Sequence, residues 1–307
     1  MSDNQLSGSI PSSLANISNL ENMFFFNNIL SGSIPIELGN LKSLIDLKAN
    51  HNQLIGTIPS SLANLSNLQH LYLHQNKLSR PIPIKLGNLE SLTVLGVGDN
   101  QISGSIPSTL ANLSNLQYLY LNENKLFGTI PQGLGSLELF HLQMYNNRLS
   151  GHLPEDLCNG GKLQLLIVNG NQLTALASIH ALKYLDISHN NFHGQLSQNW
   201  SKCKNLTALM MAYNNISGSI PPEFGNSTQL QRLDLSSNSL VGEIPKEFEK
   251  MKSMFYLYLS DNQLSDIIPQ ELGSLHHLLA LDLSKKYIEW VDSKKYWLLG
   301  IPLLLES

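Results

Sequence analysis

Two short stretches decide the fold: residues 116–124 read LQYLYLNEN, and residues 100–107 read NQISGSIP. In the first, leucines alternate with other residues in the pattern L-x-x-L-x-L-x-x-N. This alternation predicts a short β-strand with one buried face. The second stretch contains a glycine and a proline, two residue types that favour turns. Together the two stretches predict a strand, a corner and a return segment.

This unit repeats along the chain. Asparagine recurs every 24 residues from Asn4 to Asn124, and the series continues after shorter steps to Asn262. Twelve strand segments follow from it, the first at residues 20–25 and the last at residues 278–283. We expect each corner amide to bond backbone groups of neighbouring turns, because an unpaired buried polar group costs about 1–3 kcal/mol. The predicted asparagine ladder comprises Asn28, Asn52, Asn76, Asn100, Asn124, Asn147, Asn171, Asn190, Asn214, Asn238 and Asn262.

Stacked units of this kind predict an α/β-type repeat solenoid, a curved right-handed superhelix. Its strands would lie about 4.8 Å apart in a parallel sheet on the concave side, with short 3-10 or helical turns on the convex side. Return segments such as residues 12–20 would close the core with Leu14, Ile17 and Leu20. Segments ending in LAN (residues 62–64 and 110–112) alternate with segments ending in LGN (38–40 and 86–88), which gives a longer period of 48 residues.

The repeats predict one domain over residues 1–286, without cysteine-containing caps, followed by a non-repeat tail at residues 287–307. Residues 172–189 form an irregular short repeat, because the step from Asn171 to Asn190 is 19 residues. We expect a pinched coil there, with the strand ladder kept.

The pattern L-x-x-L-x-L-x-x-N-x-L-S-G-x-I-P over residues 1–286 resembles the ectodomains of plant leucine-rich-repeat receptor-like kinases. Residues 152–164 (HLPEDLCNGGKLQ) and 193–209 (HGQLSQNWSKCKNLTAL) are similar to a subgroup of receptor kinases that interact with the male-discoverer receptor. The resemblance implies a role in defence or pollen-tube signalling. It also implies a secreted peptide or protein ligand, a co-receptor with leucine-rich repeats, and extracellular repeats at the plasma membrane.

The same resemblance implies a secretion signal, a membrane helix and a cytoplasmic serine/threonine kinase, and the sequence predicts none of them. The amino terminus is polar from its second residue, and no apolar run approaches the ~18 residues of a membrane span. The kinase motifs GxGxxG, VAIK, HRD and DFG are absent, and CNGGKL at 158–163 lacks the Ser or Thr of a phosphate loop. We therefore expect a non-catalytic chain, truncated at both ends, whose location the sequence leaves unknown.

Composition excludes other classes of function. The chain holds 60 leucines and 32 asparagines, and 14% of its residues are charged, against roughly 25% in an average protein. A net charge of -4 gives no electrostatic reason to bind nucleic acid or an anionic membrane. His70 and His141 lie three repeats apart, roughly 14 Å by strand spacing, too far to share a metal ion. We expect no metal and no cofactor.

The concave face is the candidate ligand-binding surface. Residues between the buried leucines point outward there, and tyrosine and histidine supply large, rigid, partly polar contact area. The alternative is that the aromatic residues only shield the sheet from solvent. The candidate ligand-binding residues are His70, Tyr72, His74, Tyr118, Tyr120, His141, Gln143 and Tyr145.

Seven N-x-S/T sequons make the chain a candidate glycoprotein if it enters the secretory pathway. They begin at Asn16, Asn64, Asn112, Asn199, Asn205, Asn215 and Asn226.

The sequence leaves three functions open. The first is a ligand-recognition module, and the second is a fragment of a membrane receptor kinase whose kinase domain is absent here. The third is a non-functional relic, or an intracellular scaffold or enzyme inhibitor.

Overall fold

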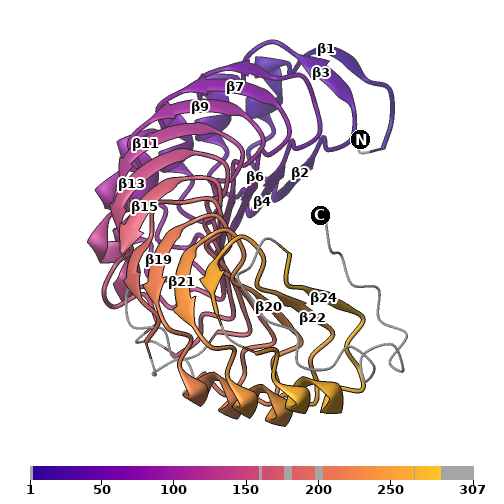
Figure 1. Cartoon of the computed structure of the whole chain (residues 1–307). Helices are drawn as coiled ribbons and strands as arrows, with labels where there is room; N and C mark the ends of the chain where they lie inside the picture. Colours follow the sequence, from indigo (N-terminus) through magenta and orange to yellow (C-terminus); the bar gives the residue numbers. More distant parts are fainter. Residues whose placement is uncertain (1–2, 159–160, 176–181, 198–202, 266, 285–307) are drawn as a thin grey trace. The chain divides into compact units, whose positions relative to one another are not determined.

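The computed structural model describes residues 3–158, 161–175, 182–197, 203–265 and 267–284. They form two compact units, divided between Leu163 and Gln164. In each unit the chain winds in coils (Figure 1). Along a typical coil a first strand is followed by a corner, a second strand and a return segment. The predicted repeat solenoid, with a parallel sheet on one face and 3-10 turns on another, is confirmed.

In the described part of the first unit, six parallel strands form one sheet in chain order. Each is three residues long, and its central leucine or methionine is buried, as with Leu71 and Leu95 at 0% exposure. Since side chains alternate along a strand, the two flanking residues face away from the core. We call this outward surface the ligand face, after the expectation that a ligand would bind there. The strands are β2 (Asn22–Phe24), β4 (Asp46–Lys48), β6 (His70–Tyr72), β8 (Val94–Gly96), β10 (Tyr118–Tyr120) and β12 (His141–Gln143).

The second unit repeats this arrangement with six further parallel strands. They are β14 (Leu165–Ile167), β16 (Tyr184–Asp186), β18 (Ala208–Met210), β20 (Arg232–Asp234), β22 (Tyr256–Tyr258) and β24 (Ala280–Asp282).

A second set of strands follows the corners of the coils, and most neighbouring members of this set pair in parallel within a unit. In the first unit they are β1 (Ser7–Ser9), β3 (Ile29–Ser31), β5 (Ile55–Gly56), β7 (Lys77–Arg80), β9 (Gln101–Gly104), β11 (Lys125–Thr129) and β13 (Arg148–His152). In the second unit they are β15 (Gln172–Ala175), β17 (His193–Gln195), β19 (Asn215–Gly218), β21 (Ser239–Gly242) and β23 (Gln263–Leu264).

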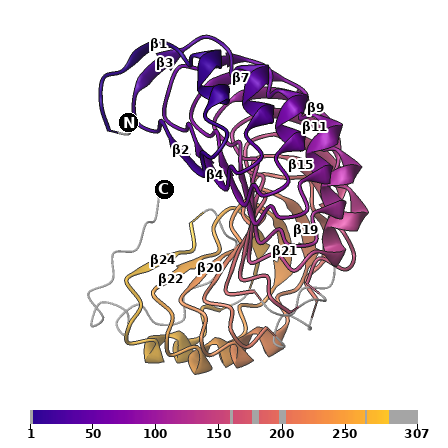
Figure 2. The same cartoon turned by 180° about the vertical axis from the view of Figure 1, so that it is seen from behind.

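Short 3-10 helices form most of the described return segments, on the side of the first unit away from its sheet (Figure 2). A proline occupies the N-cap of each described helix, where its fixed φ near −65° suits the start of the turn. The helices are η1 (Ser12–Asn16), η2 (Ile36–Asn40), η3 (Ser60–Asn64), η4 (Ile84–Asn88), η5 (Ser108–Asn112), η6 (Gln132–Ser136), η8 (Pro222–Asn226), η9 (Lys246–Lys250) and η10 (Gln270–Ser274).

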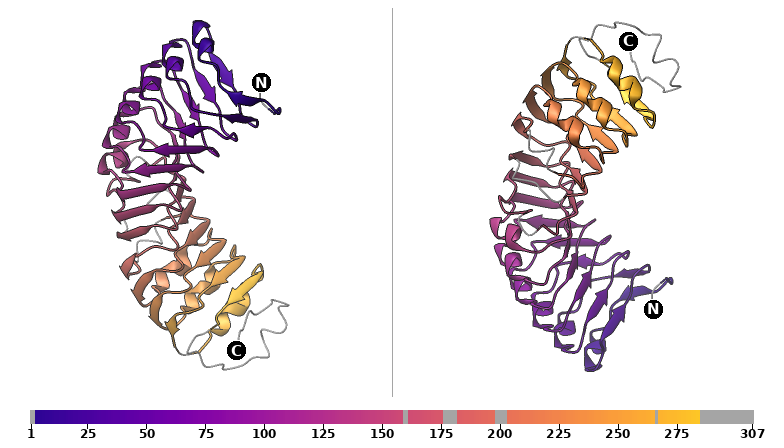
Figure 3. Two further views of the ribbon diagram at one scale, coloured as in Figure 1. Left: turned by 90° about the horizontal axis from the view of Figure 1, so that it is seen from above. Right: turned by 90° about the horizontal axis from the view of Figure 1, so that it is seen from below.

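The core lies between the sheet and the 3-10 helices, and both views in Figure 3 show the two layers within each unit. Leu38, Leu41 and Leu44 are each 0% exposed, as the sequence predicts for this return-segment pattern. The expectation is wrong for Ile17, which is 49% exposed. Among the described residues, its helix η1 has a neighbouring return segment, η2, on one side only.

Each corner is held by its asparagine, as Asn100 illustrates. The side-chain oxygen of Asn100 accepts a hydrogen bond at 2.9 Å from the backbone N–H of Leu78 in the preceding coil. Ile102 donates in the same way to Asn124 one coil further on. The amide nitrogen of Asn100 donates to three carbonyl groups at 2.9 to 3.1 Å, one of them that of Leu73 in the preceding coil. One side chain therefore ties two successive coils together. Acceptor and donor bonds of the same kind are made by Asn28, Asn52, Asn76, Asn124, Asn147, Asn190, Asn214, Asn238 and Asn262.

The remaining member of the ladder, Asn171, donates to the carbonyls of Val168 and Asn169. In the short repeat that follows it, β16 pairs in register with both β14 and β18, so the strand ladder is kept there. Residues 176–181 of that repeat, and the predicted tail at 287–307, lie outside the described residues.

The residue before each corner asparagine adopts a left-handed backbone conformation, which the sequence did not predict. Before Asn171 this residue is Gly170, with a φ of 65°. Before the other ten asparagines φ lies between 50° and 55°, although the residue is not glycine. These residues are Asn27, His51, Gln75, Asp99, Glu123, Asn146, His189, Tyr213, Ser237 and Asp261.

Candidate functional site on the sheet of the first unit

The eight candidate ligand-binding residues all lie on the ligand face or directly beyond its strands. His70 and Tyr72 belong to β6, Tyr118 and Tyr120 to β10, and His141 and Gln143 to β12. His74 and Tyr145 follow two residues after β6 and β12. All eight side chains are half-buried. The strand register aligns Tyr118 with His141, and Tyr120 with Gln143.

Strand β8 divides these residues into two clusters. It presents only Val94, Gly96 and, just beyond it, Gly98, and all three are buried. A Cβ atom on Gly96 would lie 3.3 Å from Cδ1 of Tyr72 and 3.5 Å from Nδ1 of His74. The two rings therefore rest on the backbone of the next strand. Sequence reasoning missed this arrangement, because glycine contributes no outward side chain to the pattern.

The first cluster is continued on β4 by charged residues. His70 Nδ1 lies 2.5 Å from Oδ1 of Asp46, and Lys48 Nζ lies 3.9 Å from the same oxygen. The Lys48 ammonium also lies 4.9 Å from the ring centre of Phe24 and 5.5 Å from that of Tyr72. Cation–π contacts at such distances are favourable. Phe24, Asp46 and Lys48 therefore belong to the same surface, although the candidate set omitted them.

The second cluster is held together by ring contacts. Tyr118 meets His141 edge to face at 5.2 Å between ring centres, and it stacks on Phe140 at 6.0 Å. The Tyr120 hydroxyl lies 3.4 Å from Nδ1 of His141. Such contacts restrict ring motion, so the surface is partly ordered before any ligand arrives.

Burial shifts the pKa of several of these groups, and in each case it favours the uncharged form. It raises the pKa of the Tyr72 phenol, with smaller contributions from Asp46 and Tyr118, and it raises the pKa of Tyr120 and Tyr145. Burial lowers the pKa of His74 and of His141. In each case the low-dielectric surroundings disfavour the charged form. At neutral pH the phenols of Tyr72, Tyr120 and Tyr145 and the imidazoles of His74 and His141 are therefore uncharged.

The sheet of the second unit carries a different group of residues. The Arg232 guanidinium lies 5.8 Å from the ring centre of Tyr256 and 5.4 Å from that of Tyr258. Its Nε is buried and has no hydrogen-bond partner among the described residues. Burial is also the main cause that raises the pKa of Asp186. Compared with the ligand face of the first unit, this second surface has fewer aromatic and more charged residues.

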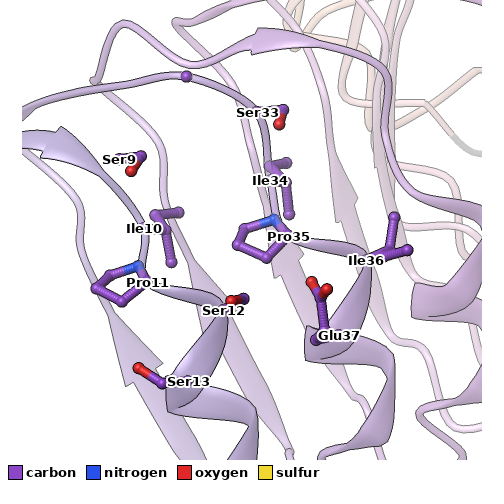
Figure 4. Close-up of a pocket in the computed structure, with 11 residues that line it drawn as sticks. Ser9, Ile10, Pro11, Ser12, Ser13, Ser33, Ile34, Pro35, Ile36 and Glu37 are labelled. Atoms are coloured by element: carbon purple, nitrogen blue, oxygen red, sulfur yellow. The ribbon is translucent and has the colours of Figure 1, made fainter.

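A pocket of about 670 Å³ lies away from either sheet face, between the first two coils. Ile10 and Pro11 of one coil and Ile34 and Pro35 of the next occupy equivalent positions in it (Figure 4). Serine hydroxyls and Glu37 supply its polar groups. A pocket with corresponding isoleucine and proline residues occurs in the second unit, so the feature follows from the repeat and not from one site.

Within the described ranges, no three His, Cys, Asp or Glu side chains are placed to hold a metal ion. The same part of the chain has no helix of the length and apolarity that crossing a membrane requires.

Family models for leucine-rich repeats match most of the repeat region. One model, described as leucine rich repeat, matches residues 180–240 and 229–288. A two-copy model matches residues 90–136, and a single-repeat model matches residues 67–89 and 138–159. Between them they cover more than half of the chain, which therefore belongs to the leucine-rich-repeat proteins.

The repeat region is similar to the ectodomains of plant receptors. The plant peptide hormone receptor RGFR1, solved in complex with RGF2, is 36% identical with a TM-score of 0.90 over 93% of this chain and 47% of that chain. The Arabidopsis receptor kinase HAESA, solved with the peptide hormone IDA and the co-receptor SERK1, is 31% identical with a TM-score of 0.75 over 94% of this chain and 57% of that chain. Receptor-like protein 13 of Arabidopsis thaliana is 41% identical over 51 residues, which are 16% of this chain and 5% of that protein. The chain thus spans about half the length of these two solved structures.

Proposed function

We propose that this chain is a non-catalytic recognition module that binds a peptide or protein on the ligand face of its first unit. The observation that carries the proposal is the pair of aromatic and histidine clusters around Tyr72 and Tyr120. These rings are half-buried and held by neighbours, so a ligand pays little entropy to order them. The similarity to two ectodomains solved with peptide hormones supports this choice of ligand class.

The test is a peptide-binding screen with three matched variants. We expect Tyr72→Ala and Tyr120→Ala to weaken binding of the recovered peptides by at least tenfold. Phe127→Ala is the control, because Phe127 is 54% exposed on β11, away from the ligand face. Circular dichroism would verify that all three variants fold. Equal binding by all the variants would exclude the two clusters as the binding site.

We further propose that the whole protein is a receptor of the plasma membrane with extracellular repeats. A co-receptor with leucine-rich repeats would be its second partner, and the protein would belong to the male-discoverer-interacting subgroup. One support is the similarity to an ectodomain solved with SERK1. The other is that this chain matches 47% and 57% of the two solved receptor chains, as a part of a longer receptor would. Sequencing a full-length transcript tests this: a reading frame that joins these repeats to a membrane helix and an HRD motif would support it, and one without them would contradict it.

Glycosylation of the sequons is part of the same proposal. Six of the seven sequon asparagines are described, and all six are exposed; Asn199 lies outside the described residues. Asn16, Asn64 and Asn112 are the last residues of η1, η3 and η5, so their glycans would lie away from the ligand face. Expression through a plant secretory pathway, followed by glycan removal and mass measurement, would detect these modifications or their absence.

A further inference from the structure

A contact between two histidines joins neighbouring coils at the edge of the ligand face. His51, in the corner after β4, and His74, in the corner after β6, meet edge to face with 5.4 Å between their ring centres. His74 also meets Tyr72 edge to face at 5.9 Å. Tyr72 and His74 both lie over Gly96, as described above. The three rings thus form a chain of contacts from an exposed corner to the centre of the first cluster.

The position of His51 is set by its backbone. It precedes the ladder residue Asn52 and has a φ of 55°, and its N–H donates to the carbonyl of His74 at 3.0 Å. Because the backbone of each residue is fixed by the coil, only side-chain rotation can separate the two rings.

Few charged groups face this pair. The coil of His51 contributes Asp46 and Lys48, β6 contributes His70 and Tyr72, and the coil after it contributes Asp99. Asp46 is already engaged by His70 and Lys48. Asp99 is the acidic group whose charge favours protonation of His74.

We propose that the His51–His74 contact is a proton-sensitive latch that sets the position of Tyr72 on the ligand face. With both imidazoles neutral, the edge-to-face contact holds His74, and His74 holds the Tyr72 ring over Gly96. When both imidazoles carry a proton, two like charges face each other across the contact. His74 then rotates away from His51, and Tyr72 loses the ring that packs against it.

The titration of His74 agrees with this geometry. Burial lowers the pKa of His74 most, the nearby His51 lowers it further, and Asp99 opposes both. His74 is therefore neutral and its contact with His51 closed at neutral pH, and the open form requires acid. As regulation of binding, the latch rests on the proposed function, because only a ligand that contacts Tyr72 would sense it.

The latch is tested without a ligand, by NMR of the full chain with labelled histidine and tyrosine rings between pH 7.5 and 5.0. We expect the Tyr72 ring resonances to shift with the same midpoint as the His74 imidazole. In His51→Gln, the pKa of His74 should rise, and the Tyr72 shift should fall by at least half. His193→Gln, which changes an exposed histidine on β17, should leave both titrations unchanged.

Tyr72 resonances that stay constant while His74 titrates would overturn the latch, and so would an equal Tyr72 shift in His51→Gln. Neither result depends on peptide binding. Conversely, a peptide screen in which Tyr72→Ala and Tyr120→Ala bind normally would remove the proposed function and leave the NMR result intact.

Discussion

At the scale of single residues, the corner of each coil combines one feature that the sequence revealed with one that it did not. The corner asparagines stand out because their spacing is regular and an amide both donates and accepts hydrogen bonds. The left-handed residue before each of them does not stand out, because its identity varies from His51 to Gln75 to Tyr213. Backbone conformation there is imposed by the bonds of the neighbouring coils, and no residue type marks it.

Arg80 is a second left-handed residue, and it gives the first prediction. It has a φ of 72° at the position where Gly56 and Gly104 serve in the adjacent coils. A left-handed conformation costs a non-glycine residue about 1–2 kcal/mol, whereas glycine loses about 0.5–1 kcal/mol through chain entropy. We therefore expect Arg80→Gly to stabilise the protein by about 0.5–1 kcal/mol in urea unfolding. Lys77→Gly, on the same strand without a positive φ, should destabilise by a similar amount; a loss of stability in both variants would contradict the argument.

The asparagine ladder gives the second prediction. Asn100→Ala removes one acceptor and three donor contacts, and it leaves partly buried backbone groups unpaired. We expect a loss of about 2–4 kcal/mol, because each such group costs about 1–3 kcal/mol and water will reach some of them. The control is Asn115→Ala, since Asn115 makes one exposed bond to the Glu90 carbonyl at 2.8 Å and should cost under about 1 kcal/mol. Equal losses would mean that the ladder contributes no more than a surface bond.

At the scale of elements, the alternation of LGN and LAN return segments has a physical cause. A Cβ atom on Gly39 in η2 would lie 2.3 Å from the carbonyl oxygen of Ser61 in η3. The Ser61 hydroxyl in turn donates to the carbonyl of Ile36 at 2.6 Å. Gly87 and Thr109 repeat both features one doublet later. The sequence shows the 48-residue period, but the close approach of two helices that explains it depends on their packing.

This approach gives the third prediction. Gly39→Ala should destabilise the protein by about 1–3 kcal/mol, because a new methyl group meets fixed backbone and the two coils must separate. Gly273→Ala is the matched control, since Gly273 has the same place in η10 and no atom of the described residues lies within 4 Å of its added Cβ. Thermal unfolding of both variants measures the difference. Equal midpoints would show that the first coils can separate without cost.

At the scale of the whole molecule, the repeat was predictable and the ligand face only in part. The alternation of buried leucines places Tyr72, Tyr120 and His141 on the outer surface of the strands, because side chains alternate along a strand. Their grouping depends on neighbours in other coils, such as the glycines of β8 and the pairing of Asp46 with His70. The contact between His51 and His74 depends on corner geometry, and no spacing rule in the sequence marks it.

The half-buried histidines of this face give the last prediction, the response of stability to acid. Burial lowers the pKa of both His74 and His141, so below the ordinary value of about 6.5 the unfolded chain binds more protons than the folded one. Stability must therefore fall as the pH decreases from about 6.5 through the lowered pKa values, and it must level off below them.

In urea unfolding at pH 7.5, 6.0 and 5.0, the double variant His74→Gln/His141→Gln should lose less stability in acid than the unchanged chain. His193→Gln should behave like the unchanged chain, because the histidine it replaces is exposed. If the double variant lost as much stability as the unchanged chain, the acid response would arise elsewhere, and the two imidazoles would have the same proton affinity folded as unfolded.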